Sequence, residues 1–455
     1  MKTKSIIAIT IATAALTLTS CETMDNLASK LDNISQKTGP KYTLPASYDE
    51  AYSYRTNFAY KEIVSLVKNK TLDSLRTSNP TKYVQEACAK ISELAKNDFE
   101  KTKMAHDFIA VLVSYDAKNF WAGTVPAQDF ANVLKTKLAV CEGYANTLKK
   151  FLDTLKISCE IVHGYARGVG TSPASQENPK ASNHAWNIVK INGEHYLVDC
   201  TWDSGHMEGR VSKQAYNTDW LFVKPEHFIY SHFPDSAKKQ LLEQPLSAEE
   251  FTSLPDFRPV FFDITNGANV PNKIQNCGGV YTWELEAKDG YKLSFAAGNV
   301  STRRELQDRI LTKTIDGKTS VTFSLPESGD YEVQIFYWKQ GAKSGAGCGS
   351  FVLRATEGSD ILYPTIFPNS GKNAYIVEPL EMPLKKGETQ KFSVHVENKK
   401  FVAVICGRDF IQLEGDENGN FTGEIEIPQN IKELSIAISN SENRGYEGLA
   451  RYKVE

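Results

Sequence analysis

The sequence predicts an α+β domain followed by a region that consists only of β-strands. In the first part, apolar side chains recur at helical spacing, for example over residues 105–113. Three segments with strand patterns follow between residues 159 and 202, and helices followed by strands are typical of the α+β class. From about Asp263, apolar and polar residues alternate, which is the pattern of half-buried strands.

Length, composition and charge exclude several classes of protein. With 455 residues, and about 150 residues to a domain, the chain has room for about three domains. Hydrophobic residues make up 41% of it, so it can bury cores and is not disordered throughout. The net charge is −3 without any long basic run, so we expect no nucleic-acid partner. Beyond the N-terminus no apolar run is long enough for a membrane helix, which excludes a protein with several spans.

Residues 1–20 have the pattern of a secretory signal peptide, with two lysines before an apolar segment at 6–18. The segment ends in Leu18-Thr19-Ser20-Cys21, which resembles the bacterial lipobox, where the cysteine is lipidated. The alternative is an ordinary signal peptide with a cysteine there by chance. A lipid on Cys21 would anchor the chain to a membrane without a span.

Residues 21–45 are polar and contain glycine and proline, so we expect a flexible tether. Together with the signal pattern, the tether predicts a lipid-anchored protein of the cell envelope. It would face the periplasm or the surface, and it would sit at the outer membrane if the source is Gram-negative.

Residues 46–262 are expected to form one α+β domain. Within it, Asn192-Gly193 separates two strand patterns and is a strong signal for a two-residue hairpin turn. The predicted helices include residues 80–96, 98–115 and 141–156, and the predicted strands are residues 159–166, 185–191 and 195–202.

A weak repeat divides the all-β region. The segment Phe323–Pro326 and the strand pattern after it are similar to Ile425–Pro428 and the pattern that follows there, 102 residues further on. That spacing is the length of one β-sandwich. We predict two immunoglobulin-like β-sandwich domains, 263–358 and 359–455, which position the enzyme or bind a cell-envelope protein partner.

Cys141 begins the predicted helix 141–156. The positive end of the helix dipole would favour a thiolate there, as a nucleophile requires. The alternative is a small buried residue, a common role for cysteine. Cys141 is one of eight cysteines; without Cys21 seven remain, so an exported chain keeps at least one free thiol.

The hairpin at Asn192-Gly193 brings a histidine and a carboxylate together. If the two-residue turn holds, His184 faces Thr201, and Asp199 lies diagonally from His184 on the same face. Such a pair can serve as base and orienting carboxylate for a nucleophilic cysteine. Alone, each residue has a plain alternative: a structural histidine, and an aspartate that caps a turn.

Other candidate groups have weaker signals. Gln128, 13 residues before Cys141, is the polar candidate for an oxyanion donor beside the Cys141 backbone N–H, and the alternative is a surface glutamine. Trp186 and Trp202 could shape an acyl tunnel or pack in the core. The spacing of the histidines and cysteines fits no metal site, so we expect neither metal nor cofactor; the histidines considered are His163, His195 and His206.

Three motifs resemble the transglutaminase-like superfamily: Val140–Ala145, Asn183–Asn187 and Tyr196–Trp202. Residues 220–229 and the segments after them resemble bacterial kyphoscoliosis-peptidase-like lipoproteins. The resemblance implies a papain-like, transglutaminase-like core of helices and an antiparallel sheet. It also implies roles for three residues: Cys141 as nucleophile, His184 as general base and Asp199 as the group that orients His184.

The expected function is that of an exported, membrane-anchored cysteine enzyme. By the resemblance it would be a peptidase or amidase that acts on a protein or peptide through an acyl-thioester on Cys141. Two alternatives stay open: a transglutaminase that cross-links proteins by acyl transfer to amines, and a non-catalytic scaffold or adhesion lipoprotein. Members of the family can lose catalysis, but all three residues of the triad are retained here.

Overall fold

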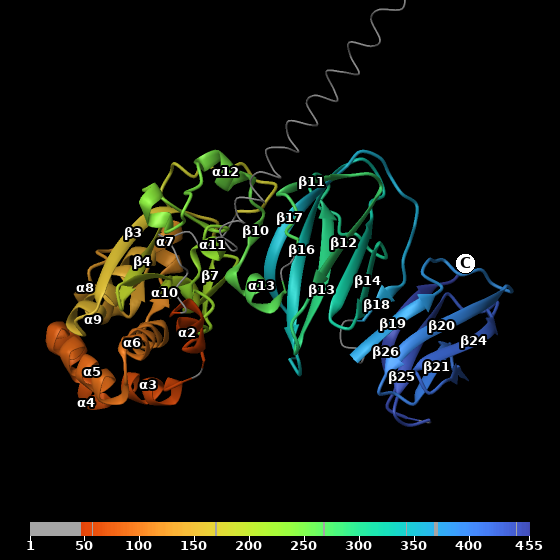
Figure 1. Cartoon of the computed structure of the whole chain (residues 1–455), viewed down its shortest axis with the longest axis horizontal. Coiled ribbons are helices and arrows are strands. Elements are labelled where there is room, and N and C mark those ends of the chain that lie inside the picture. The colour runs from red at the N-terminus through yellow and green to blue at the C-terminus, as the bar shows by residue number, and fades with distance from the viewer. Residues whose placement is uncertain are drawn as a thin grey trace, which may run out of the picture. The chain divides into compact units, whose positions relative to one another are not determined.

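The computed structural model describes residues 47–455 except 57, 169–170, 267–268, 343, 368–371 and 443. Cys21, the expected signal peptide and the expected tether lie outside the described residues. The chain divides into two compact units (Figure 1): unit 1 runs to Thr171 and includes Gln176–Leu254, and unit 2 comprises Ser172–Ser175 and Pro255–Glu455. In the described part of the chain, no helix has the length and hydropathy of a membrane span.

Helices form most of the first half of unit 1. Five of them begin after an asparagine or aspartate whose side chain accepts a hydrogen bond from a backbone N–H of the first turn, as capping requires. The helices are α2 (Ser47–Ser53), α3 (Tyr60–Val67), α4 (Lys70–Ser78), α5 (Pro80–Leu94), α6 (Asp98–Leu112), α7 (Ala117–Ala122), α8 (Phe130–Thr136) and α9 (Cys141–Thr154).

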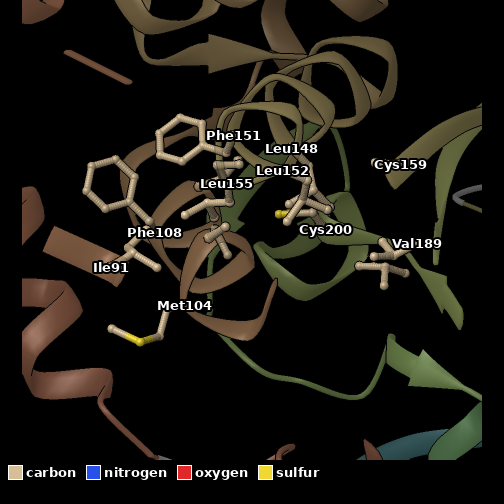
Figure 2. Packing of buried hydrophobic residues seen from close by; sticks show 14 of the residues in the cluster. Ile91, Met104, Phe108, Leu148, Phe151, Leu152, Leu155, Cys159, Val189 and Cys200 are labelled. Carbon is tan, nitrogen blue, oxygen red and sulfur yellow. The ribbon is translucent and has the colours of Figure 1, made fainter. Parts of the chain in front are cut away.

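The hydrophobic core of unit 1 packs α6 against α5, α9 and the sheet. Phe108 of α6 and Phe151 of α9 lie with their ring centroids 5.3 Å apart (Figure 2). Complete burial of a side chain of this size stabilises the fold by roughly 2–3 kcal/mol. This packing fixes the position of α9 and therefore of its first residue, Cys141.

The sheet of unit 1 has the strand order β8-β5-β4-β3-β9. Its central hairpin has the predicted register, with Ile191 opposite Glu194, so that prediction is confirmed. Asn192 and Gly193 have φ of 54° and 91°, the positive values that a type I′ turn needs. The strands are β3 (Ser158–Ala166), β4 (His184–Ile191), β5 (Glu194–Val198), β8 (Leu221–Val223) and β9 (His232–Pro234).

Two predicted elements of unit 1 are cut short by the element that follows them. β5 ends at Val198, and helix α10 (Cys200–Asp203) replaces the predicted end of the strand because Asp199 caps that helix. The prediction that His184 faces Thr201 is therefore wrong. The predicted helix 98–115 ends at Leu112, since β1 (Ser114–Tyr115) pairs in parallel with β2 (Leu138–Ala139).

Shorter elements complete unit 1 after α10. They are β6 (Gly205–Glu208), β7 (Val211–Gln214), α11 (Pro225–Phe228), the 3-10 helix η1 (Ala237–Gln240) and α12 (Ala248–Ser253). The segment from α11 to β9 returns the chain to the sheet, where β9 pairs with β3 at its edge.

The first part of unit 2 contains two sheets. One has the order β10-β17-β16-β13, with β11 also on β17, and the other has the order β12-β15-β14. Because Asp256 in β10 pairs with Ser350, the C-terminal segment of unit 2 begins at Pro255, earlier than the boundary expected near residue 263. The elements are β10 (Asp256–Phe257), α13 (Pro259–Ile264), β11 (Ile274–Cys277), β12 (Val280–Glu286), β13 (Tyr291–Asn299), β14 (Ile310–Ile315), β15 (Lys318–Ser324), β16 (Gly329–Lys339) and β17 (Ala346–Ala355).

The second part of unit 2 again contains two sheets, β18-β26-β25-β21-β22 and β19-β20-β24-β23. Alternate residues of both sheets, such as Phe392 and Val394 from one and Ile436 and Ile438 from the other, share one core. The predicted fold class, an α+β core followed by β-sandwiches, is confirmed. The strands are β18 (Thr365–Ile366), β19 (Lys372–Glu378), β20 (Thr389–Glu397), β21 (Phe401–Cys406), β22 (Asp409–Gln412), β23 (Glu414–Gly415), β24 (Asn420–Glu426), β25 (Glu433–Ser439) and β26 (Glu447–Lys453).

Candidate active site

Cys141 is the half-buried first residue of α9. The chain before it is held by β2, where Ala139 lies opposite Tyr115. Gly143, in the first turn of α9, lets the helix pack closely against Gln128 and Ala139. A Cβ at this position would lie 2.4 Å from Gln128 Oε1 and 2.8 Å from the Ala139 side chain. The sequence thus places the thiol at a helix N-terminus, where the backbone dipole favours an anion.

His184 and Asp199 meet at the ends of the central hairpin. His184 is the first residue of β4, and its Nε2 lies 2.7 Å from Asp199 Oδ2. The other oxygen, Oδ1, accepts hydrogen bonds from the backbone N–H groups of Thr201 and Trp202 at 2.9 and 3.3 Å, so Asp199 also caps α10. Because Nε2 is engaged by Asp199, Nδ1 is the ring nitrogen of His184 that is left for a partner such as Cys141, whose side chain contributes to the raised pKa of His184.

The charges of this site support one another. Burial opposes a charge on His184, but the Asp199 carboxylate and the hydrogen bond to Cys141 raise the pKa of His184 to about 10. Burial also opposes ionisation of Asp199, but His184 and His232 keep the pKa of that carboxyl well below its usual range. At neutral pH the pair is therefore an imidazolium and a carboxylate.

A second histidine binds the same carboxylate oxygen. His232 in β9 is fully buried, and its Nε2 lies 3.2 Å from Asp199 Oδ2. Its Nδ1 lies 2.8 Å from Ser231 Oγ. Sequence reasoning assigned His232 no role, since it lies 33 residues from Asp199 and no spacing rule connects the two.

His184, Asp199 and His232 have the residue types and the proximity of a metal site, since their ligand atoms lie within 4.8 Å of one another. Two of the three pairs, however, are at hydrogen-bonding distance, 2.7 and 3.2 Å. The observed spacing is thus accounted for by hydrogen bonds to one carboxylate oxygen, and we derive no metal chemistry from it.

Comparison with known proteins identifies the fold that carries this site. The family model described as "Transglutaminase-like superfamily" matches residues 85–200, a span that includes Cys141, His184 and Asp199. The chain carries a transglutaminase-like domain. A solved structure described as a crystal structure of a TGase is 18% identical, with a TM-score of 0.22. The alignment covers 32% of this chain and 35% of the chain in that structure.

Two curated relatives of the transglutaminase-like domain are kyphoscoliosis peptidases. The one from Mus musculus is 29% identical over 182 residues, which are 40% of this chain and 27% of the relative. The one from Homo sapiens is 30% identical over 204 residues, which are 42% of this chain and 31% of the relative. The chain therefore spans less than a third of the length of these relatives.

Gln128 lies close to the start of α9, where Cys141 is found. Its Oε1 accepts a hydrogen bond from the backbone N–H of Val140 at 2.9 Å, and its Nε2 donates to the Pro126 carbonyl at 2.9 Å. The side chain thereby braces the backbone just before Cys141. Its role as an oxyanion donor stays a prediction.

The three histidines that the sequence analysis considered as metal ligands lie apart from the group formed by His184, Asp199 and His232. His163 contacts Glu142 at 2.8 Å on the surface, and His206 contacts Glu208 at 3.4 Å, also on the surface. His195 is exposed in β5, where its backbone carbonyl accepts a hydrogen bond from Tyr48. In the described residues these three do not join the group of His184, Asp199 and His232.

Two tryptophans lie beside His184 in the transglutaminase-like domain. Trp202 is half-buried with its ring 5.3 Å from that of His184, and Trp186 is fully buried with its ring 6.1 Å away. Trp186 Nε1 has no hydrogen-bond partner among the described residues. Trp186 belongs to a buried cluster, and Trp202 is packed against that cluster beside His184, so core packing accounts for both positions and the acyl tunnel stays a prediction.

Proposed function

We propose that the transglutaminase-like domain is a cysteine peptidase or amidase that acts through an acyl-thioester on Cys141. The observation that carries the proposal is the 2.7 Å contact of His184 Nε2 with Asp199 Oδ2, in the same compact unit as Cys141, whose side chain contributes to the raised pKa of His184. Nucleophile, base and orienting group in this order are the arrangement that amide cleavage by a thiol requires.

In the acylation step, the Cys141 thiolate attacks an amide carbonyl and a carbon–sulfur bond forms. Backbone N–H groups at the start of α9 would stabilise the oxyanion, in line with their place at a helix N-terminus. The carbon–nitrogen bond then breaks, and the His184 imidazolium gives its proton to the leaving amine. Asp199 keeps the ring of His184 oriented throughout.

In the second step, neutral His184 takes a proton from an acceptor that attacks the thioester. With water as acceptor, the carbon–sulfur bond breaks, the product is a carboxylic acid, and Cys141 leaves as the thiolate beside the His184 imidazolium. A primary amine as acceptor gives a cross-link. The half-buried Trp202 next to His184 supports cross-linking as a second candidate function, because an aromatic side chain there limits the access of water.

Cys141 should be the fastest cysteine to react with iodoacetamide at pH 7. The matched control is Cys277, because it is the other half-exposed cysteine among the described residues. It lies in unit 2, away from the candidate site, and burial raises the pKa of its thiol, so it should react more slowly. Peptide mass spectrometry of the full chain gives both rates in one sample. Equal rates would favour the non-catalytic scaffold instead.

Hydrolysis and cross-linking are distinguished by measuring how much of the thioester reacts with water and how much reacts with an amine. The full chain is incubated with a glutamine-containing peptide library and excess labelled primary amine, and free acid, ammonia and incorporated label are measured together. We expect acid to exceed label. Dominant incorporation at millimolar amine would establish the cross-linking function, and neither product from a folded protein with free Cys141 would reject the enzyme.

We also propose that the chain is exported and lipid-anchored through Cys21, and that its β-sandwich domains contact a cell-envelope protein. The support is the pattern of residues 1–45, with its apolar segment, Leu18-Thr19-Ser20-Cys21 and polar tether. Replacement C21S should release the chain from membranes into the soluble fraction in high salt. A variant that stays with the membranes would contradict the lipid anchor.

A further inference from the structure

The buried histidine His232 is not used by the chemistry described above, although it contacts the catalytic carboxylate. It lies beyond residue 200, where the match to the transglutaminase-like family model ends, and reaches the site because β9 pairs with β3 at the sheet edge. Ala166 of β3 lies opposite His232 in that pairing. The residue is therefore added to the site by a segment outside the matched domain.

Hydrogen bonding fixes the tautomer of His232. An ionised carboxylate only accepts, so Nε2 of His232 must donate to Asp199 Oδ2. For a neutral ring, Nδ1 must then accept, and Ser231 Oγ is the donor at 2.8 Å. The Phe228 carbonyl is a second acceptor for the Ser231 hydroxyl, but it lies further away, at 3.2 Å.

The surroundings of His232 keep it uncharged. Burial is the main cause that lowers the pKa of His232 to about 4; the charge of His184 lowers it further, and Asp199 opposes both. The ring stacks on Phe228 at 4.0 Å and is enclosed by indole rings, those of Trp202, Trp186 and Trp220, at 4.5, 5.0 and 5.2 Å.

We propose that His232 is a positioning residue that holds Asp199 as a charged, fixed acceptor for His184. Two histidine N–H groups converge on Oδ2, while two backbone N–H groups hold Oδ1. With all four donors in place, the carboxylate has one orientation and stays ionised inside the protein. The proposal rests on the proposed function, because it assigns His232 a part in activating Cys141 through Asp199 and His184.

The test uses H232F in the full chain, because phenylalanine fits among the aromatic rings while it removes the donor to Asp199. Ser231 keeps the Phe228 carbonyl as a partner in this variant. The readout is the rate of Cys141 alkylation by iodoacetamide from pH 5 to pH 9, which needs no substrate. At pH 7 the rate should fall about tenfold, the effect expected from losing one hydrogen bond to a charged group.

Three comparisons separate positioning from a general loss of structure. H232Q retains an N–H donor and should restore part of the rate. H206F changes an exposed histidine and should leave the Cys141 profile unchanged. In a D199N background, H232F should have no further effect, since the group on which His232 acts is gone; additive losses would overturn the proposal.

The outcomes distinguish this inference from the proposed function. Equal reactivity of Cys141 and Cys277 in the unaltered protein overturns the proposed function itself. A reactive Cys141 whose profile is unchanged in folded H232F overturns the role of His232 alone. If H232F does not fold, nitrogen NMR of the unaltered protein still decides: we expect neutral His232 with the proton on Nε2 at pH 7, and a proton on Nδ1 alone would overturn the inference.

Discussion

Helix α10 has a carboxylate at each end, and each carboxylate contacts a buried histidine. Asp199, just before the helix, contacts His184 and His232. Asp203, the last residue of the helix, contacts His106 Nε2 at 3.0 Å and accepts the backbone N–H of Trp220. Each end of α10 therefore carries a histidine–aspartate pair at hydrogen-bonding distance.

The two pairs differ in what lies beyond the histidine. Cys141, which is half-exposed, contributes to the raised pKa of His184. His106 instead contacts Asp107 at 3.0 Å, and Asp107 forms an ion pair with Lys103, with all of these side chains fully buried. A buried histidine–carboxylate pair is thus a way to satisfy polar groups in a core, and it becomes a candidate active site only where it meets an accessible nucleophile.

The environments of the two carboxylates differ in the same way. Burial raises the pKa of Asp203 to about 7, and its contact with His106 only partly opposes this shift. At Asp199 the two histidines outweigh burial and hold the pKa well below its usual range. The comparison leads to three predictions, ordered from the largest expected effect to the smallest.

The largest effect is expected for D199N. The variant keeps the shape of the side chain but removes the charge that orients His184, so kcat for amide hydrolysis should fall by about 10³- to 10⁴-fold. Steady-state kinetics with a peptide amide give the value. D203N is the matched variant at the other end of α10, and it should reduce kcat of the folded protein far less. Equal losses would show that the two carboxylates act as one unit.

The next effect concerns stability at the Asp203 end. In K103M the Asp107 carboxylate loses its buried cation, which should lower the free energy of unfolding by about 3–5 kcal/mol. The matched control is K101M on the same helix, whose partner Asp98 is partly exposed, with an expected loss below about 1 kcal/mol. Urea unfolding measures both. A cost for K103M as small as that for K101M would contradict the importance of the buried network.

The smallest effect is a difference in pH dependence between the two histidines of Asp199. The pKa of His184 is raised to about 10, so its contribution to stability is complete below pH 6.5 and is lost as the pH rises toward 10. The pKa of His232 is lowered to about 4, so the unfolded chain binds a proton first, and stability is lost as the pH falls from 6.5 to 4.

The variant H232F isolates the acidic part of this dependence. Between pH 6.5 and 4 the unaltered protein should lose up to about 3 kcal/mol of unfolding free energy through His232, and H232F should lack that slope. Urea unfolding at closely spaced pH values measures the difference, and H206F serves as control. Identical acid slopes in H232F and the unaltered protein would show that His232 is not held neutral.

Most of the candidate triad was predictable from the sequence because its signals are local. A two-residue turn at Asn192-Gly193 sets the pairing of its strands, and a helix pattern that begins at Cys141 places the thiol at a dipole end. The predicted pairing of His184 with Thr201 failed because Asp199 caps a helix, and a capping aspartate ends a strand. His184 and Asp199 still meet, since the chain turns only after Val198.

The sequence by itself determined the order of helices and strands, the register of the hairpin and the three residues of the candidate site. These follow from periodicity, capping and turn preferences, which act over a few neighbouring residues. Only the tertiary structure decided that His232 contacts Asp199 and that His106 contacts Asp203, across separations of 33 and 97 residues. Such contacts depend on which strand occupies the sheet edge and which helix fills the core, and those choices are made by packing of the whole unit.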